Sequence, residues 1–268
     1  MDLTGITSAA NPICKRLISL RQRKHRRENR QLVLEGLRGV KDAVEAGWMP
    51  ELVMVSHHFE DMKGARALMA QLETMEVQGY MVPDELMNKL SDTETPQGIM
   101  AVFPQPEVFL EKLLKQERGF WLVLDRIQDP GNLGTLIRSG EAAGVSGVFL
   151  THGTTDPYSP KALRASTGAV LHLPVAELSA ADSDCFFLRK EGIHLVGAAL
   201  EGGTPYYQTH FRLPLALVIG NEANGIAEDL LDLVQQRVTI PMKGSLQSIN
   251  AAIAGSVLLF HLSRELAV

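Results

Sequence analysis

The sequence predicts an α/β protein in two parts, of which the second is built on a parallel sheet. From residue 120 onward, short apolar runs alternate strictly with helical segments, a pattern typical of a parallel sheet covered by helices on both faces. Residues 1–105 show a shorter series of the same kind. Between the two, 106–119 begins with a proline and is rich in charged residues, so we predict a linker there.

The first part, 1–105, is predicted to be a small α/β unit. Gly47 suits the left-handed position that closes a helix, and the stretch 92–98 carries the Pro, Thr and Gly of a loop. The predicted strands are 31–37, 51–55 and 99–103, and the predicted helices are 39–46 and 63–76.

The second part, 120–268, is predicted to carry the chemistry. Ligands of parallel sheets bind beyond the carboxyl ends of the strands, so the loops that follow the strands are the places to search. The predicted strands are 121–124, 147–150, 193–198, 215–219 and 238–240, and the helices are 133–143, 161–168, 227–234 and 249–266.

Composition excludes several classes of protein. No apolar run approaches the roughly 20 residues that span a bilayer, and the first ten residues lack the order of a secretory signal. Cys14 and Cys185 are the two cysteines and stand far apart, which argues against a disulfide framework or a zinc site. We therefore expect a reduced, cytoplasmic protein without metal and without a membrane segment.

Positive charge is concentrated near the start of a chain whose formal net charge is −5. Such a cluster favours a surface that binds phosphates, and hence a polyanionic partner. A solvated helix face remains the alternative. The run consists of Lys15, Arg16, Arg21, Arg23, Lys24, Arg26, Arg27 and Arg30, interrupted by Glu28.

Three segments of the second part hold polar residues after predicted strands. In 125–138, Pro130 forces a turn, Asn132 is predicted to cap the next helix, and Arg138 lies further along that helix. Each feature also has a structural explanation, such as an ordinary turn with a surface arginine. No glycine-rich phosphate loop follows any strand, so a dinucleotide or P-loop site is not indicated.

The second and third segments add a carboxylate and a run of small residues. Glu222 stands between Gly220, which permits close approach of backbone, and Gly225, which suits a tight turn. In 240–250, Ser248 is predicted to cap a long helix whose start is rich in alanine. A first-turn glutamate and ordinary core packing are the structural alternatives here.

Taken together and in this order, the three segments resemble the signature motifs of the SpoU/TrmH family of SPOUT methyltransferases. The resemblance covers residues 120–268 and reaches the first part through 34–36 and 95–98. One departure is Ile249, where the family usually has leucine. The matching residues are Asp129-Pro130-x-Asn132-x-Gly134-x-x-Ile137-Arg138, then Gly220-Asn221-Glu222-x-x-Gly225, then Ile240-Pro241-Met242-x-Gly244 with Ser248-Ile249-Asn250.

The resemblance implies a fold, a cofactor and a partner. The fold is a C-terminal SPOUT domain with a deep trefoil knot, a rare exception among protein folds, preceded by a ribosomal-protein-like α/β domain that binds the RNA substrate. S-adenosylmethionine would lie bent in the knot, and the family works as a homodimer in which the partner's Arg138 helps to complete each site. The cofactor-binding residues implied are Leu200, Gly220, Ile240, Met242 and Ile249.

The resemblance also implies roles in methyl transfer to a ribose 2′-hydroxyl. Arg138 is the family's proposed base, but a guanidinium stays protonated in ordinary surroundings, so we favour a bidentate clamp on the neighbouring RNA phosphate. Asn132, Ser248 and Asn250 would orient the ribose and Arg138, and Glu222 would fix the loop or Arg138. Arg23, Lys24, Arg26 and Arg27 are the predicted RNA-binding residues.

Three alternatives remain open at this point. The RNA could be transfer RNA rather than the favoured large-subunit ribosomal RNA. The acceptor could be a base nitrogen rather than a ribose oxygen. The chain could also be a non-catalytic RNA-binding or ribosome-assembly protein, although such a protein is expected to have lost the motif residues that are present here.

Overall fold

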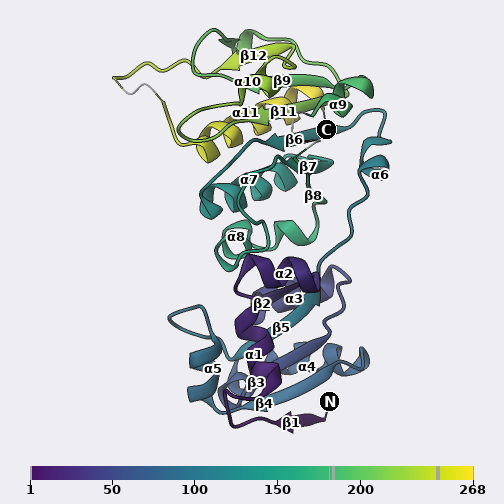
Figure 1. The fold of residues 1–268 in the computed structure, drawn as a ribbon, viewed down its shortest axis with the longest axis vertical. Coiled ribbons are helices and arrows are strands. Elements are labelled where there is room, and N and C mark those ends of the chain that lie inside the picture. The colour runs from purple at the N-terminus through teal and green to yellow at the C-terminus, as the bar shows by residue number, and fades with distance from the viewer. Residues whose placement is uncertain (1, 181, 183–184, 246–247, 268) are drawn as a thin grey trace. The chain divides into compact units, whose positions relative to one another are not determined.

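The computed structural model describes residues 2–180, 182, 185–245 and 248–267. The chain divides into two compact units, which we describe separately. Unit 1 comprises 1–107 with 158–163, and unit 2 comprises 108–157 with 164–268 (Figure 1). No helix of the described residues is both long and apolar enough to cross a membrane. The same residues contain no group of three or more His, Cys, Asp or Glu side chains placed to hold a metal ion.

Unit 1 is a five-stranded mixed sheet in the order β1-β4-β3-β5-β2. Strands β1, β4 and β3 run parallel, whereas β5 is antiparallel to both of its neighbours. The predicted strands and helices are all found here, with ends moved by a few residues. The bounds are β1 Leu3–Gly5, α1 Pro12–Ser19, α2 Arg23–Asn29, β2 Gln31–Glu35, α3 Leu37–Glu45, β3 Leu52–Ser56, η1 His57–Asp61, α4 Ala65–Thr74, β4 Gln78–Val82, α5 Asp84–Leu90 and β5 Ile99–Pro104.

The sheet of unit 1 carries helices on both faces. On one face, Leu17 of α1 and Leu86 of α5 join a buried cluster with alternate strand residues such as Met54 and Val102. On the other, α3 packs on β2, β5 and α4, and Trp48 meets Phe103 edge to face with ring centroids 6.3 Å apart. The period-two alternation along β5 thus serves two separate layers of core.

Unit 2 is a seven-stranded sheet in the order β10-β12-β9-β11-β6-β7-β8, and every pair is parallel. This confirms the predicted parallel sheet. The bounds are α6 Leu110–Leu114, β6 Phe120–Leu124, α7 Pro130–Ala142, β7 Gly147–Leu150, η2 Ala169–Leu171, β8 Val175–Glu177, α9 Phe186–Lys190, β9 His194–Ala198, β10 Thr204–Pro205, η3 Tyr206–Gln208, β11 Leu215–Ile219, α10 Glu228–Leu231, β12 Gln236–Thr239 and α11 Ala251–Leu266. Helix α8, Pro160–Ser166, begins in the residues of unit 1 and ends in those of unit 2.

Helices cover both faces of this sheet as well. Trp121 of β6 belongs to a buried cluster with residues of α6, α9 and α10. On the opposite face α7 packs against α11, where Gly255 lies so close to Leu136 that an added Cβ would stand 2.3 Å from its side chain. The small residues at the start of α11 therefore allow the two helices to pack closely, which was the alternative of ordinary core packing. They also leave room for the pocket described below.

Two helix starts differ from the sequence-based prediction. Asn132 does not cap α7: Asp129 is the capping residue, and its side chain accepts a hydrogen bond from the Asn132 backbone N–H at 2.9 Å. Ser248 does not cap α11: Asn250 does, accepting from the N–H groups of Ala252 and Ile253. The carboxylate and amide oxygens thereby satisfy N–H groups that lack partners in the first turn.

Candidate active site

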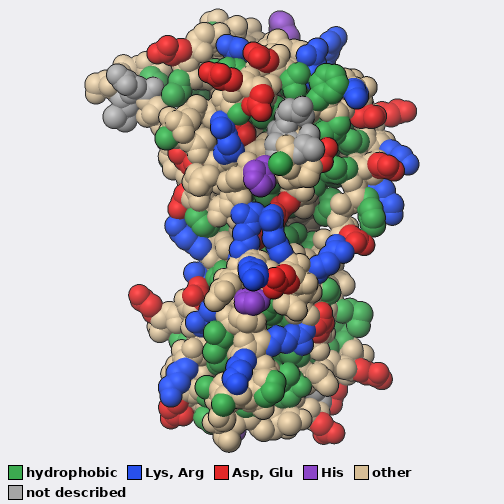
Figure 2. All heavy atoms as spheres, viewed as in Figure 1, with side chains coloured by type: hydrophobic (Ala, Val, Ile, Leu, Met, Phe, Trp, Pro, Cys, Tyr) green, Lys and Arg blue, Asp and Glu red, His purple; other side chains and the backbone are tan. Residues whose placement is uncertain are grey.

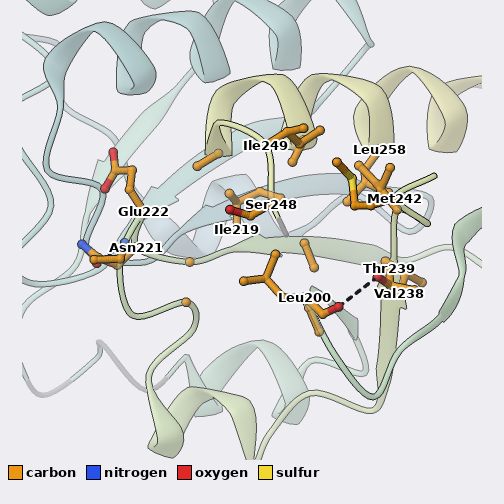
Figure 3. Close-up of a pocket in the computed structure, with 18 residues that line it drawn as sticks. Leu200, Ile219, Asn221, Glu222, Val238, Thr239, Met242, Ser248, Ile249 and Leu258 are labelled. Atoms are coloured by element: carbon orange, nitrogen blue, oxygen red, sulfur yellow. Dashed lines mark hydrogen bonds between the residues drawn. The ribbon is translucent and has the colours of Figure 1, made fainter. Parts of the chain in front are cut away.

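A pocket opens in unit 2 where β9, β11 and β12 end. Its walls come from these strand ends, the loop after β11 and the start of α11. In Figure 3, Glu222 lies at one end, Met242 near the other, and Leu200 lies across from Ile249. The lining residues are Ala198, Ala199, Leu200, Ile219, Gly220, Asn221, Glu222, Ala223, Gly225, Val238, Thr239, Ile240, Met242, Ser248, Ile249, Ala251, Ala254 and Leu258.

The structure brings the five predicted cofactor-binding residues together around this one pocket, although they come from three separate parts of the chain. Leu200 is 71% exposed and Met242 is 38% exposed, so both lie at the rim. Ser248 also lines the pocket. Leu246 and Gln247, from the same motif segment, lie outside the described residues.

Gly220 is required by the loop's own backbone. An added Cβ would stand 2.2 Å from the Gly225 carbonyl carbon and from the Ile226 nitrogen. Asn221 and Gly225 exchange backbone hydrogen bonds of 2.9 Å, and Gly225 has a φ of +67°. The prediction that Gly225 forms a tight turn is confirmed, and the close approach expected at Gly220 occurs within the loop itself.

Glu222 binds the start of α7, a helix that lies far away in the sequence. Its carboxylate accepts hydrogen bonds from the backbone N–H groups of Gln128 at 3.2 Å and Asp129 at 3.3 Å. The structural alternative, a first-turn residue of the helix that follows, is therefore wrong: Glu222 contacts the positive end of another helix, where the dipole favours a carboxylate.

Asn132 links Glu222 to Asn250. Its Nδ2 donates to Glu222 Oε1 at 2.9 Å, and its Oδ1 accepts from Asn250 Nδ2 at 2.9 Å. Because Asp129 caps α7, the side chain of Asn132 remains available for both bonds. One residue from each of the three motif segments thus meets at the Glu222 end of the pocket.

The ionisation of Glu222 follows from these contacts. Burial raises the pKa of this carboxyl, but the hydrogen bonds from Asn132 and from the backbone N–H groups of Glu222, Gln128 and Asp129 outweigh it, so that the pKa lies below its usual value. Glu222 is therefore a carboxylate at neutral pH and acts here as an acceptor that fixes geometry.

Arg138 is not part of this network within one chain. Its side chain is exposed and its Nη1 donates to Thr167 Oγ1 at 3.4 Å, a long hydrogen bond. It lies six positions after Asn132 in α7, which turns the two side chains roughly 120° apart around the helix. The predicted catalytic residues therefore form two groups: Asn132, Glu222 and Asn250 are joined, and Arg138 stands apart.

Buried Asp125 joins three loops at the same edge of the sheet. Its carboxylate accepts from Thr151 Oγ1 at 2.8 Å and from the Ala227 backbone N–H at 2.8 Å. The side chain is 3% exposed. Sequence reasoning missed this residue, although the available signal was a carboxylate directly after a fully apolar strand.

Asn221 was missed as a site-building residue as well. Its Nδ2 donates to the Arg126 carbonyl at 2.7 Å, which ties the loop after β11 to the loop after β6. Its Oδ1 accepts from the N–H groups of Ala223 and Asn224, as an asparagine does in a local turn. Asn221 is part of the second motif, but nothing in the sequence indicates its hydrogen-bond partner.

The predicted RNA-binding residues of unit 1 differ in their exposure to solvent. Lys24 and Arg27 of α2 are exposed, and Arg23 is half-buried. Arg26 is 3% exposed, and its Nη1 donates to the carbonyls of Leu20 at 2.7 Å and Arg21 at 2.6 Å. Arg26 therefore holds the turn between α1 and α2, and its assignment as an RNA contact does not fit this environment. In Figure 2, Lys and Arg side chains occur on both units among Asp and Glu.

Comparison with known proteins bears on both units. The model of the SpoU rRNA Methylase family matches residues 119–260, and that of the MRM3-like substrate binding domain matches residues 11–101. A 23S rRNA (guanosine(2553)-2′-O)-methyltransferase, RlmP, from Bacillus subtilis is 34% identical over 96% of this chain and 98% of its own length.

Two further relatives are similar over most of their length. A 23S rRNA (uridine(2479)-2′-O)-methyltransferase from Streptomyces viridochromogenes is 32% identical over 92% of this chain and 87% of its own. The crystal structure of an AdoMet-bound rRNA methyltransferase from Sinorhizobium meliloti has a TM-score of 0.88 and 32% identity, covering 98% of both chains.

Proposed function

The chain belongs to the SpoU rRNA methylase family, and on that premise we propose that it transfers a methyl group from S-adenosylmethionine to a ribose 2′-hydroxyl of large-subunit ribosomal RNA. The observation that carries the proposal is the Asn250–Asn132–Glu222 chain of hydrogen bonds at one end of the pocket. The names of the relatives favour ribosomal over transfer RNA.

The pocket suits this cofactor by its lining, which is mostly apolar with a few polar groups, as is usual for small-molecule sites. Ala198, Ala199, Ala251 and Ala254 leave space beside backbone, as a flat base requires, and apolar Leu258 and Ile249 can cover it. We assign cofactor binding to the rim and wall residues Leu200, Gly220, Ile240, Met242 and Ile249.

When bound, S-adenosylmethionine supplies a methyl group on a positively charged sulfur. The protein's task is to hold the ribose hydroxyl against it, and such positioning can lower a barrier by several kcal/mol, up to about 7–11. We assign ribose orientation to Asn132, Asn250 and Ser248. Glu222 holds Asn132, and Arg138 clamps an RNA phosphate as a permanent cation.

We propose that unit 1 binds the RNA through the exposed cations of α2, Lys24 and Arg27, together with half-buried Arg23. The trefoil knot implied by the resemblance remains part of the proposed fold. We place the reaction in the cytoplasm, where the buried thiols of Cys14 and Cys185 would stay reduced.

We further propose a homodimer that shares its active sites. Ile253, Val257 and Phe260 form an apolar stripe on α11 and are 57%, 38% and 53% exposed. Their spacing places them on one helix face, and a second copy of the chain would bury them. A shared site also accounts for Arg138, which lies apart from the Asn132 network of its own chain.

The dimer has a matched test. Phe260→Asp should shift the mass measured by light scattering toward the monomer, whereas Phe186→Asp, which changes a phenylalanine of α9 that is 46% exposed, should not. If the wild type is monomeric at working concentrations, the dimer is excluded.

Active-site sharing is tested by mixing two inactive variants. Arg138→Ala and Ala254→Leu, which fills the pocket, should each lack activity, but a mixed dimer should regain it at one site. Mixed dimers that form without regaining activity would assign each Arg138 to its own chain.

The proposed reaction is tested with purified protein, methyl-labelled S-adenosylmethionine and either ribosomal or transfer RNA. We expect label in the large-subunit ribosomal RNA, at a position where the chain then resists alkaline hydrolysis because its 2′-hydroxyl is blocked. Label on a base would instead support the base-nitrogen alternative, and binding without transfer would support the non-catalytic one.

The cofactor site has its own control. Ala254→Leu should weaken binding of S-adenosylmethionine at least tenfold by calorimetry. Ala142→Leu, the same change at an exposed position of α7, should leave it within twofold. Equal affinities of the two variants would place the cofactor elsewhere.

A further inference from the structure

Arg126 occupies a half-buried position at the edge of the sheet where the reaction is proposed. It follows β6 directly after Asp125, in the loop that leads to Asp129 and α7. Since every strand of unit 2 runs parallel, this loop and the loop after β11 emerge at the same edge. RNA that reaches Asn132 must pass close to this loop.

The backbone of Arg126 is held in place from three sides. Its carbonyl accepts from Asn221 Nδ2 at 2.7 Å and from Gln128 Nε2 at 3.4 Å, and its N–H donates to Thr151 Oγ1 at 3.1 Å. Its φ of +53° is uncommon for a residue with a side chain. Such a conformation persists only where the surroundings enforce it, and it is most frequent at functional sites.

The guanidinium of Arg126 is oriented by Asp125 but keeps N–H donors for a further partner. Its Nη2 lies 3.4 Å from Asp125 Oδ2, and the side chain is 41% exposed. Its Nε is buried without a hydrogen-bond partner among the described atoms. A guanidinium has five N–H donors in a fixed fork, so the edge turned away from Asp125 can still bind an oxyanion.

The negative charges around the site explain why a cation is needed at this position. Asp129 and Glu222 place two carboxyl groups at the start of α7, and the carboxyl group of Asp125 lies in the loop that leads to it. They would repel the phosphates of an approaching RNA. An arginine fixed beside them offsets that repulsion at the place where a phosphate next to the target ribose must lie.

We propose that Arg126 binds an RNA phosphate beside the methylated nucleotide, as a second cationic contact separate from Arg138. This inference rests on the proposed function. The alternative is a purely structural role, in which Arg126 only neutralises buried Asp125.

The experiment measures three quantities on the full-length protein: the KM for ribosomal RNA, the salt dependence of RNA binding by filter retention, and the Kd for S-adenosylmethionine. Arg126→Ala should raise KM about tenfold and reduce the slope of log K against log salt by about 1. Its kcat at saturating RNA and its Kd for S-adenosylmethionine should change less than threefold. Arg126→Lys, which keeps the charge, should recover part of the loss.

The control is Arg212→Ala, which removes an exposed arginine before β11, at the opposite edge of the sheet. It should leave KM and the salt slope unchanged. An unchanged slope in Arg126→Ala, with a lower melting temperature or weaker cofactor binding, would overturn the inference in favour of the structural role. Failure of the wild type to methylate RNA would instead overturn the proposed function, and the inference with it.

Discussion

Asn132 Nδ2 donates to Glu222 Oε1 at 2.9 Å across 90 residues of sequence, while Oδ1 of the same amide accepts from Asn250. Both ends of the amide are therefore used, and its orientation is fixed by its partners. An amide held in this way can present a defined edge to a substrate, since any rotation would break two hydrogen bonds.

Asn132→Asp tests this orientation. The substitution replaces the donor by a carboxylate that faces Glu222, so repulsion replaces a hydrogen bond. We expect kcat to fall at least a hundredfold, measured as methyl transfer at saturating RNA. Asn250→Asp keeps the oxygen that caps α11 and should have a smaller effect; the reverse order would show that Asn250 is the more important member.

Arg138→Ala should abolish methyl transfer while leaving the affinity for S-adenosylmethionine within about tenfold, because the residue is exposed and does not line the pocket. Single-turnover transfer and calorimetry measure the two quantities. Transfer near the wild-type rate would remove Arg138 from the mechanism.

The basic residues of α2 should separate into two types. Replacing exposed Lys24 and Arg27 with alanine should weaken RNA binding and lower the salt slope by about 1 per lost phosphate contact. Arg26→Ala should instead lower the melting temperature, since two backbone carbonyls lose their donor. A full salt-slope change in Arg26→Ala would contradict the structural role.

Gly220→Ala should damage the loop after β11. The new Cβ would stand 2.2 Å from backbone atoms of Gly225 and Ile226, which a side-chain rotation cannot relieve. We expect a loss of several kcal/mol of stability or of the loop's structure, with loss of cofactor binding. Gly244→Ala, where nothing lies within 4 Å of the new atom, is the control, and its melting temperature should equal that of the wild type.

The lowered pKa of Glu222 predicts that folding stability depends on pH in the acid range. Its pKa is lowered in the folded state, so folding favours the carboxylate: the stabilisation is complete above the unfolded-state pKa of about 4.3 and is lost as pH falls through the lower folded value. The melting temperature of Glu222→Gln should fall below that of the wild type at neutral pH. The difference should shrink toward acid, and a constant difference would contradict the assignment.

The parallel sheet, and the grouping of the motif residues around one pocket, were predictable because both follow from local sequence patterns. Leu215–Ile219 is apolar throughout, as a strand buried on both faces must be, and the motif residues follow strand ends. Short edge elements such as β8 and β10 were not predicted, because a run of two or three residues carries too little pattern.

The partners of the polar side chains were harder to predict, since they are set by tertiary contacts. Asp129 and Asn132 are both good capping residues, and only the packed structure shows that the first caps α7 and the second reaches Glu222. The burial of Arg26 within a basic run was hidden for the same reason, because charge alone does not reveal which side chain turns inward.

The most direct measurement is a mass-spectrometric map of 2′-O-methylated nucleotides in ribosomal RNA from cells that lack the protein, carry the wild type, or carry Arg138→Ala. We predict one ribose methylation of the large-subunit RNA that is present with the wild type alone. Identical ribose methylation in all three samples would contradict the proposed reaction.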